Sequence, residues 1–165
     1  MKERVAVVDK ANRIIGYKLR EELTEHDCWR TAHVWIEDGN GNVLLQQRKA
    51  DRKVDPLKWT CAAVGTVSGD DTYQETAVRE LFEEVGLRNI KLEERNIVHY
   101  QSSFGWRQSK GFTGMCTEPA ESLNIQDEEV EQVQWFNKAA VLRDIERGDP
   151  KYSSSAKAYK ELFGL

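Results

Sequence analysis

The chain has 165 residues, 39% of them hydrophobic and 32% charged, and its 24 basic and 28 acidic residues give a formal net charge of −4. This length suits a single domain over residues 1–165 that buries most of its apolar surface. The weak negative charge argues against a general binder of nucleic-acid polymers or of membrane surfaces.

Cysteine usage and hydropathy indicate the cellular compartment. The three cysteines, Cys28, Cys61 and Cys116, are widely spaced and form no C-x-x-C motif, unlike a secreted disulfide scaffold. The first residues are charged and lack the apolar core of a secretion signal, and no run of eighteen apolar residues follows. We therefore expect a cytoplasmic protein without a membrane segment.

The first part of the chain is rich in β-strand signals. β-branched runs separated by turns rich in Gly, Asn and Asp predict two hairpins, and a run of small residues predicts a further strand. A charged loop at residues 49–58 precedes that last strand. The predicted strands span residues 4–8, 13–17, 31–37, 43–47 and 59–64.

A helix is predicted next, with clear signals at both ends. Thr72 and Glu75 have the spacing of a capping box. Apolar residues recur every four positions from Ala77 to Val85, as one face of a helix requires. Gly86 supplies a C-terminal stop.

The remainder of the chain predicts three more strands and two helices. Alternating patterns mark the strands, Asn137 is a suitable N-cap, and a Gly and Pro segment at 148–150 separates the helices. The strands are expected at residues 97–102, 111–117 and 130–136, and the helices at 137–146 and 155–163. Pattern alone gives an α+β protein.

The predicted helix carries a cluster of carboxylates. Glu80, Glu83 and Glu84 are three and four residues apart, so they project from one side of the helix and repel each other. A divalent cation would remove this repulsion, and oxygen ligands favour magnesium, with manganese as the alternative. Arg79 is placed to reach Glu83 at i+4. Any one glutamate alone would be a solvated surface residue.

The spacing of the glycine, acidic and arginine residues between Gly65 and Leu87 indicates a particular motif. Gly65, then Asp71, then the run R-E-L-F-E-E-V-G-L from Arg79 closely resembles the Nudix signature, G-x5-E-x7-R-E-U-x-E-E-x-G-U, in which U is aliphatic. Asp71 stands where that family has glutamate. The resemblance implies an α/β/α sandwich with a mixed β-sheet, the signature loop and helix at residues 65–87, and C-terminal helices.

The Nudix resemblance also implies an activity. It is the magnesium-dependent cleavage, by water attack at phosphorus, of a diphosphate linkage in a nucleoside diphosphate joined to a group X, with nucleoside di- and triphosphates included. Metal ions that bridge the diphosphate oxygens would neutralise the charge that develops. Its partner would be a small nucleotide, and homodimers are frequent among such enzymes.

Site residues follow from the same resemblance. The expected metal ligands are Glu80, Glu83, Glu84 and the backbone carbonyl of Gly65, and Arg79 is expected to hold a ligand in orientation. The base that activates water varies in the family between a signature glutamate, here Glu80 or Glu83, and a residue on a late loop.

Glu128 and Glu129 are the candidates for a base on a late loop. Both precede the predicted strand at 130–136 and could close over the metal site. A solvated acidic run over residues 127–131 is an equally good explanation of these two carboxylates.

Two further residues are candidates for substrate contact. Arg48, at the end of a predicted strand, suits a bidentate contact with phosphate. Trp106, and with it Phe104 two residues earlier, could stack on a nucleotide base or another planar group, although aromatic residues near a hairpin more often serve packing.

Segments outside the signature resemble the Nudix branch that includes isopentenyl-diphosphate isomerases and their hydrolase relatives. The similar segments are residues 7–36, 41–48, 56–59 and 128–136. In the isomerases the strand before the signature carries a catalytic cysteine and, two residues on, a metal-binding histidine. Val64 and Thr66 occupy these two positions here.

Isomerase activity is therefore the alternative to hydrolysis. His26 and His33 match the spacing of two further isomerase ligands, yet without the third histidine an exposed loop histidine and a hydrogen-bonded strand histidine explain them better. The intact glutamate box favours hydrolysis. A non-catalytic binding module, which would usually lose signature glutamates, is the least supported hypothesis.

Overall fold

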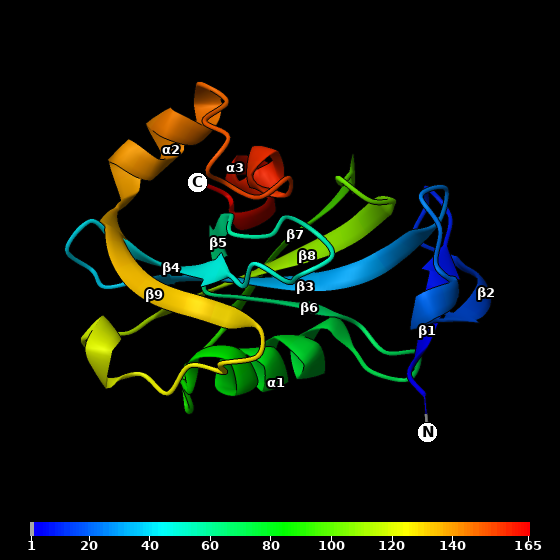
Figure 1. The fold of residues 1–165 in the computed structure, drawn as a ribbon, viewed down its shortest axis with the longest axis horizontal. Coiled ribbons are helices and arrows are strands. Elements are labelled where there is room, and N and C mark those ends of the chain that lie inside the picture. Colours follow the sequence, from blue (N-terminus) through cyan, green and yellow to red (C-terminus); the bar gives the residue numbers. More distant parts are fainter. Residues whose placement is uncertain (1) are drawn as a thin grey trace.

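The computed structural model describes residues 2–165 and contains one mixed sheet of nine strands with helices on both faces (Figure 1). This arrangement confirms the predicted α/β/α sandwich. The strands are β1 (Arg4–Val8), β2 (Ile14–Leu19), β3 (Cys28–Glu37), β4 (Asn42–Arg48), β5 (Trp59–Cys61), β6 (Ala63–Thr66), β7 (Glu93–Gln101), β8 (Trp106–Met115) and β9 (Val130–Asn137). The α-helices are α1 (Tyr73–Val85), α2 (Lys138–Glu146) and α3 (Tyr159–Phe163).

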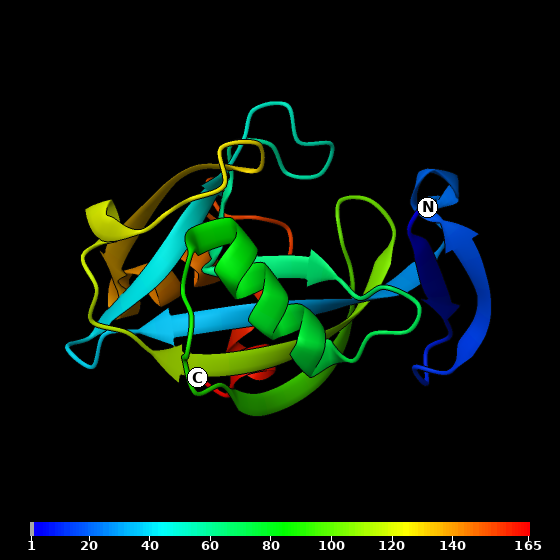
Figure 2. The ribbon, with the colours of Figure 1, turned by 90° about the horizontal axis from the view of Figure 1, so that it is seen from below.

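Strand β3 organises the sheet. It pairs antiparallel with β1, β4 and β6 and parallel with β8. Its alternate residues pack on opposite faces, as strand geometry requires. Val34 and its neighbours on one face form a buried cluster with α1, whereas Trp35 packs against Tyr159 and Phe163 of α3 at centroid distances of 5.7 and 5.2 Å. Figure 2 shows α1 lying across the sheet.

Helix α1 begins and ends as the sequence predicts. The Thr72 hydroxyl accepts a hydrogen bond from the Glu75 amide at 3.1 Å, and the Glu75 carboxylate accepts one from the Thr72 amide at 3.2 Å. Gly86 ends the helix with a φ of 75°, a left-handed conformation that costs glycine little.

The strand predicted at residues 59–64 is in fact two strands. β5 pairs with β4, whereas β6 pairs with β3. The chain changes partner at the fully buried Ala62. This change of partner was not predicted, because strand pairing depends on contacts distant in sequence. It brings Gly65 beside Ala32 of β3 and next to α1.

Other boundaries also differ from the prediction. β3 begins three residues early and β8 five residues early, because the two strands pair in parallel from Cys28 and Trp106 onward. The last predicted helix, 155–163, is a 3-10 turn at Ala156–Ala158 followed by α3. Within residues 2–165, none of the helices has both the length and the apolar character needed to cross a bilayer.

Candidate active site

Gly65 and Glu80 are in direct contact. A Cβ atom added to Gly65 would lie 2.2 Å from Cγ of Glu80 and 2.6 Å from its Cδ. No side chain fits at position 65 while Glu80 keeps this position. Both residues line the same cleft, so the glycine allows the Glu80 carboxylate to reach the cleft.

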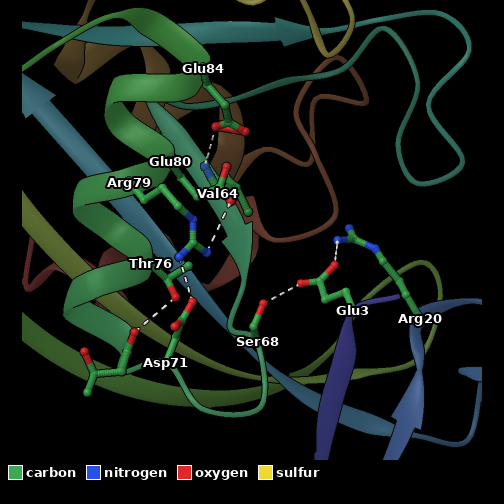
Figure 3. Close-up of polar contacts among 10 residues, drawn as sticks. Glu3, Arg20, Val64, Ser68, Asp71, Thr76, Arg79, Glu80 and Glu84 are labelled. Carbon is green, nitrogen blue, oxygen red and sulfur yellow. Dashed lines mark hydrogen bonds and ion pairs between the residues drawn. The ribbon is translucent and has the colours of Figure 1, made fainter. Parts of the chain in front are cut away.

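Glu84 lies one turn further along α1 and is held in place by the sheet. Its side chain is buried, and its Oε2 atom accepts a hydrogen bond from the Val64 amide at 3.0 Å (Figure 3). The same atom accepts a hydrogen bond from Nε2 of Gln46, also at 3.0 Å. Both bonds end on Oε2, which leaves Oε1 for another partner. The strand thus fixes the orientation of this carboxylate.

A third carboxylate joins these two. Ligand oxygens of Glu80, Glu84 and Glu129 all lie within 4.8 Å of one another. Glu129 is held nearby because the Gln126 amide bonds to the Glu84 carbonyl at 2.9 Å and the Lys49 amide to the Glu129 carbonyl at 3.1 Å. The structure thus brings one of the two predicted late glutamates to the signature helix.

The three carboxylates are electrostatically unfavourable without a cation. Burial, reinforced by the charges of Glu83 and Glu129, raises the pKa of Glu80 to about 7. Burial and the charge of Glu80 raise the pKa of Glu84 well above its usual range. Three converging carboxylates and no nitrogen or sulfur ligand fit a hard cation such as magnesium.

Two predicted site residues lie outside this group of three. Glu83 is exposed on α1, although its charge still raises the pKa of Glu80. Glu128 is exposed at the end of its loop, whereas the adjacent Glu129 lines the cleft.

Arg79 contacts a different partner from the one predicted. Its Nη1 donates to Oδ2 of Asp71 at 2.6 Å, and its Nη2 lies 3.9 Å from Oε1 of Glu80 (Figure 3). Among residues 2–165, the predicted Arg79 pair with Glu83 does not form. The reason is that helical side chains lean toward the N-terminus of their helix, where Asp71 lies. Asp71 thereby orients the arginine beside Glu80.

The carboxylates lie at one side of a cleft of about 320 Å³. The loop between β4 and β5, the turn between β7 and β8 and the segment before α3 contribute to its wall. Five cationic side chains line it: Arg20, Arg48, Arg52, Lys53 and Arg107. Acidic and basic groups thus face the same space, as required for a metal-bound polyanion.

The two predicted substrate contacts lie in different places. Arg48 lines the cleft, and its Nε donates to the Val54 carbonyl at 2.8 Å, which fixes the guanidinium. Trp106 is not among the residues that line the cleft. Its ring stacks on His99 with centroids 5.2 Å apart. Phe104, the other aromatic residue considered for stacking, lines the cleft, as do Trp29 and Tyr100.

The two histidines considered as metal ligands lie outside the carboxylate group. His33 is buried against the hydroxyls of Thr31 and Ser109 at 3.2 and 3.3 Å, and burial lowers its pKa to about 3. It is therefore neutral at physiological pH. His26 is exposed and lies 3.5 Å from Glu25.

Cys61 does not supply the missing thiol of an isomerase. Its Sγ is buried and lies 3.7 Å from Nδ1 of His33. Burial raises the pKa of the thiol to about 12, so the nucleophilic thiolate is not formed near neutral pH.

The raised pKa of Glu80 predicts a pH-dependent stability difference in metal-free protein. Because the folded state holds this proton up to pH of about 7 and the unfolded state releases it near 4.5, ionisation weakens folding as the pH rises. We expect Glu80→Gln to gain stability relative to wild type as the pH rises from 4.5 to about 7, with no further gain at higher pH. Denaturant unfolding in EDTA would measure it. A difference that stays constant with pH would contradict this prediction.

Comparison with known proteins gives consistent matches. A model of the NUDIX domain matches residues 29–157. An uncharacterized Nudix hydrolase of Pseudomonas aeruginosa is 27% identical over 143 residues, covering 86% of this chain and 83% of that protein. A prenyl-diphosphate phosphatase of Methanosarcina mazei is 26% identical over 156 residues, covering 90% of this chain and 88% of that protein. A crystal structure of a Deinococcus radiodurans protein matches this chain with a TM-score of 0.79 at 15% identity, over 98% of this chain and 99% of that chain. The two proteins therefore share a fold.

Proposed function

Because this chain belongs to the Nudix family of hydrolases, whose domain model covers residues 29–157, we propose that it is a magnesium-dependent pyrophosphohydrolase of nucleoside diphosphate derivatives. One observation carries the proposal. Three carboxylates with oxygens within 4.8 Å of one another lie beside a cleft lined by five cationic side chains. Such an arrangement suits a diphosphate held between a cation and arginines.

Glu80 and Glu84 are the proposed principal ligands of magnesium, together with the Gly65 carbonyl. Glu83, one residue away and exposed, would serve a cation nearer the solvent. When bound, magnesium would neutralise the negative charge of the diphosphate oxygens. Arg79, fixed by Asp71, is a positioning residue for Glu80.

Arg48 is the proposed contact for the diphosphate. The hydrogen bond from its Nε to Val54 leaves the terminal nitrogens for phosphate oxygens, and a guanidinium can donate two parallel bonds. Burial, followed by the charge of Arg52, lowers the pKa of Arg48. A bound anion would compensate this buried charge.

Cleft chemistry favours a polar group X over a prenyl chain. Hydroxyl side chains line much of the wall, namely Thr31, Thr60, Thr66, Ser102, Ser153, Ser154 and Ser155. Most of these hydroxyls also bond within the protein, for example Thr31 to Ser109 and Ser154 to Asp55, but an isoprenoid tail would offer the wall no donor or acceptor at all. Nucleosides and sugars offer donors and acceptors that match them.

Isomerisation of isopentenyl diphosphate is not favoured. Val64 and Thr66 offer neither thiol nor imidazole at the two decisive positions. The nearby thiol of Cys61 is fully buried. Water attack needs neither group.

The test of the proposed function is a substrate screen in ¹⁸O-labelled water with magnesium. Nucleoside di- and triphosphates, nucleotide sugars and prenyl diphosphates would be supplied in parallel, and products identified by mass spectrometry. We expect a nucleotide substrate to be cleaved at its diphosphate linkage into two products that each contain phosphate, one of which can be orthophosphate. One of the two products should carry one ¹⁸O atom from water. Exclusive turnover of prenyl diphosphates, or none across the panel, would overturn the proposal.

Glu129 is the proposed base, because it faces the cleft from a loop rather than from α1. We expect Glu129→Gln to lower kcat by about 10²- to 10⁴-fold, the usual contribution of a general base, with magnesium affinity nearly unchanged. Glu128→Gln is the matched control and should retain wild-type activity. Loss of magnesium affinity in Glu129→Gln, measured by calorimetry, would make Glu129 a ligand instead.

A further inference from the structure

Arg107 is a buried arginine that lines the cleft. Its side chain belongs to β8, and the residue is only 7% exposed. The guanidinium carbon lies 3.7 Å from the centre of the Trp29 ring, and Nη1 donates to the carbonyls of Phe104 and Trp106 at 2.8 and 3.2 Å. These neutral contacts fix the guanidinium without compensating its charge.

No carboxylate neutralises Arg107. Within the described chain, residues 2–165, no carboxylate oxygen lies within 4.0 Å of its nitrogens. Asp55, which also lines the cleft, accepts hydrogen bonds from Ser154 instead. Burial lowers the pKa of Arg107 to about 10, so the side chain remains cationic at neutral pH. A buried charge left unpaired is destabilising, which suggests that its partner is a ligand.

The position of Arg107 separates it from the carboxylates. Along β3, Arg107 pairs with Trp29, whereas Gly65 pairs with Ala32. The three residues from Trp29 to Ala32 offset these two positions by about 10 Å along β3. An anion bound at Arg107 would therefore lie beyond the phosphates held at the metal site.

We propose that Arg107 binds a second anionic group of the substrate, a phosphate or carboxylate carried apart from the scissile diphosphate. The inference rests on the proposed function and narrows its substrate class to nucleoside diphosphate derivatives that bear a further anion. Lys53, which lies 5.4 Å from the Phe104 ring centre at the same cleft, adds positive charge there. Arg107 thereby determines specificity and takes no part in bond cleavage.

The first test uses inorganic phosphate and metal-free protein, so it requires neither magnesium nor turnover. Because Arg107 lies on the Trp29 ring, we expect phosphate to change the tryptophan fluorescence of wild type and of the exposed control Arg143→Gln. The change should be lost in Arg107→Gln and in Trp29→Phe, and should persist in Arg48→Gln. No change in wild type, or the same change in Arg107→Gln, would overturn the proposal. Should Arg107→Gln fail to fold, Trp29→Phe and Arg48→Gln still decide the result.

A second test compares matched substrates in the presence of magnesium. UDP-glucuronate differs from UDP-glucose by one carboxylate, and 2′-phospho-ADP-ribose differs from ADP-ribose by one phosphate. We expect kcat/KM to favour the more anionic member of at least one pair by about 10- to 100-fold, the strength of a charge-assisted hydrogen bond. Arg107→Gln should remove the preference, because kcat/KM should fall by this factor more for the more anionic member than for the less anionic one. Hydrolysis without any preference would overturn this inference and leave the proposed function intact.

Discussion

Glu84→Gln is expected to lower kcat by more than about 100-fold, because loss of a direct ligand exceeds the 10- to 100-fold cost of an outer-shell change. The glutamine oxygen can still accept the bonds from Val64 and Gln46 that Oε2 accepts in wild type. Its amide group would then occupy the place of Oε1 and cannot bind a cation. The measurement is steady-state turnover of the substrate found in the screen, with magnesium affinity by calorimetry.

A measurement of stability distinguishes the loss of a metal ligand in Glu84→Gln from misfolding. Burial raises the pKa of Glu84, which means that ionisation of this carboxyl opposes folding. The glutamine has no such ionisation and should not lower the melting temperature in EDTA. Glu146→Gln, at an exposed glutamate of α2, is the control and should be unchanged in both measurements. Wild-type turnover by Glu84→Gln would show that Glu84 is not a ligand.

Gly65→Ala should cause the next largest loss of activity. The new Cβ would meet Cγ and Cδ of Glu80 at 2.2 and 2.6 Å, so the glutamate side chain must move. A displacement of about 1 Å in a catalytic group can cost about 100-fold in rate, and we expect a loss of that size in kcat/KM. The free energy of unfolding should fall by only about 1–3 kcal/mol, the range for overpacking.

Gly16→Ala provides the matched control. Gly16 lies in β2 and has no heavy atom within 4 Å of an added Cβ. This variant should keep both activity and stability, as measured by the same assays. Equal activity of Gly65→Ala and Gly16→Ala would mean that the position of Glu80 does not matter for catalysis.

The sequence alone determined where the helix that carries the site begins and ends. Thr72, Glu75 and Gly86 act within a few residues of their own positions, so local rules were sufficient for both ends of α1. The same regular geometry placed Glu80 and Glu84 one turn apart on a helix that packs against β6. The central hairpin at residues 38–42 was equally local: Asp38 accepts the amides of Asn40 and Asn42, and β3 and β4 pair across it.

Only the tertiary structure decided which other residues meet these two carboxylates. Glu129 joins them through backbone bonds from Gln126 to Glu84 and from Lys49 to Glu129. Arg107 reaches the cleft, and Trp106 does not, because β8 pairs in parallel with a strand more than seventy residues earlier. Contacts between segments so far apart depend on how the sheet assembles, and that information is absent from periodicity, capping and spacing.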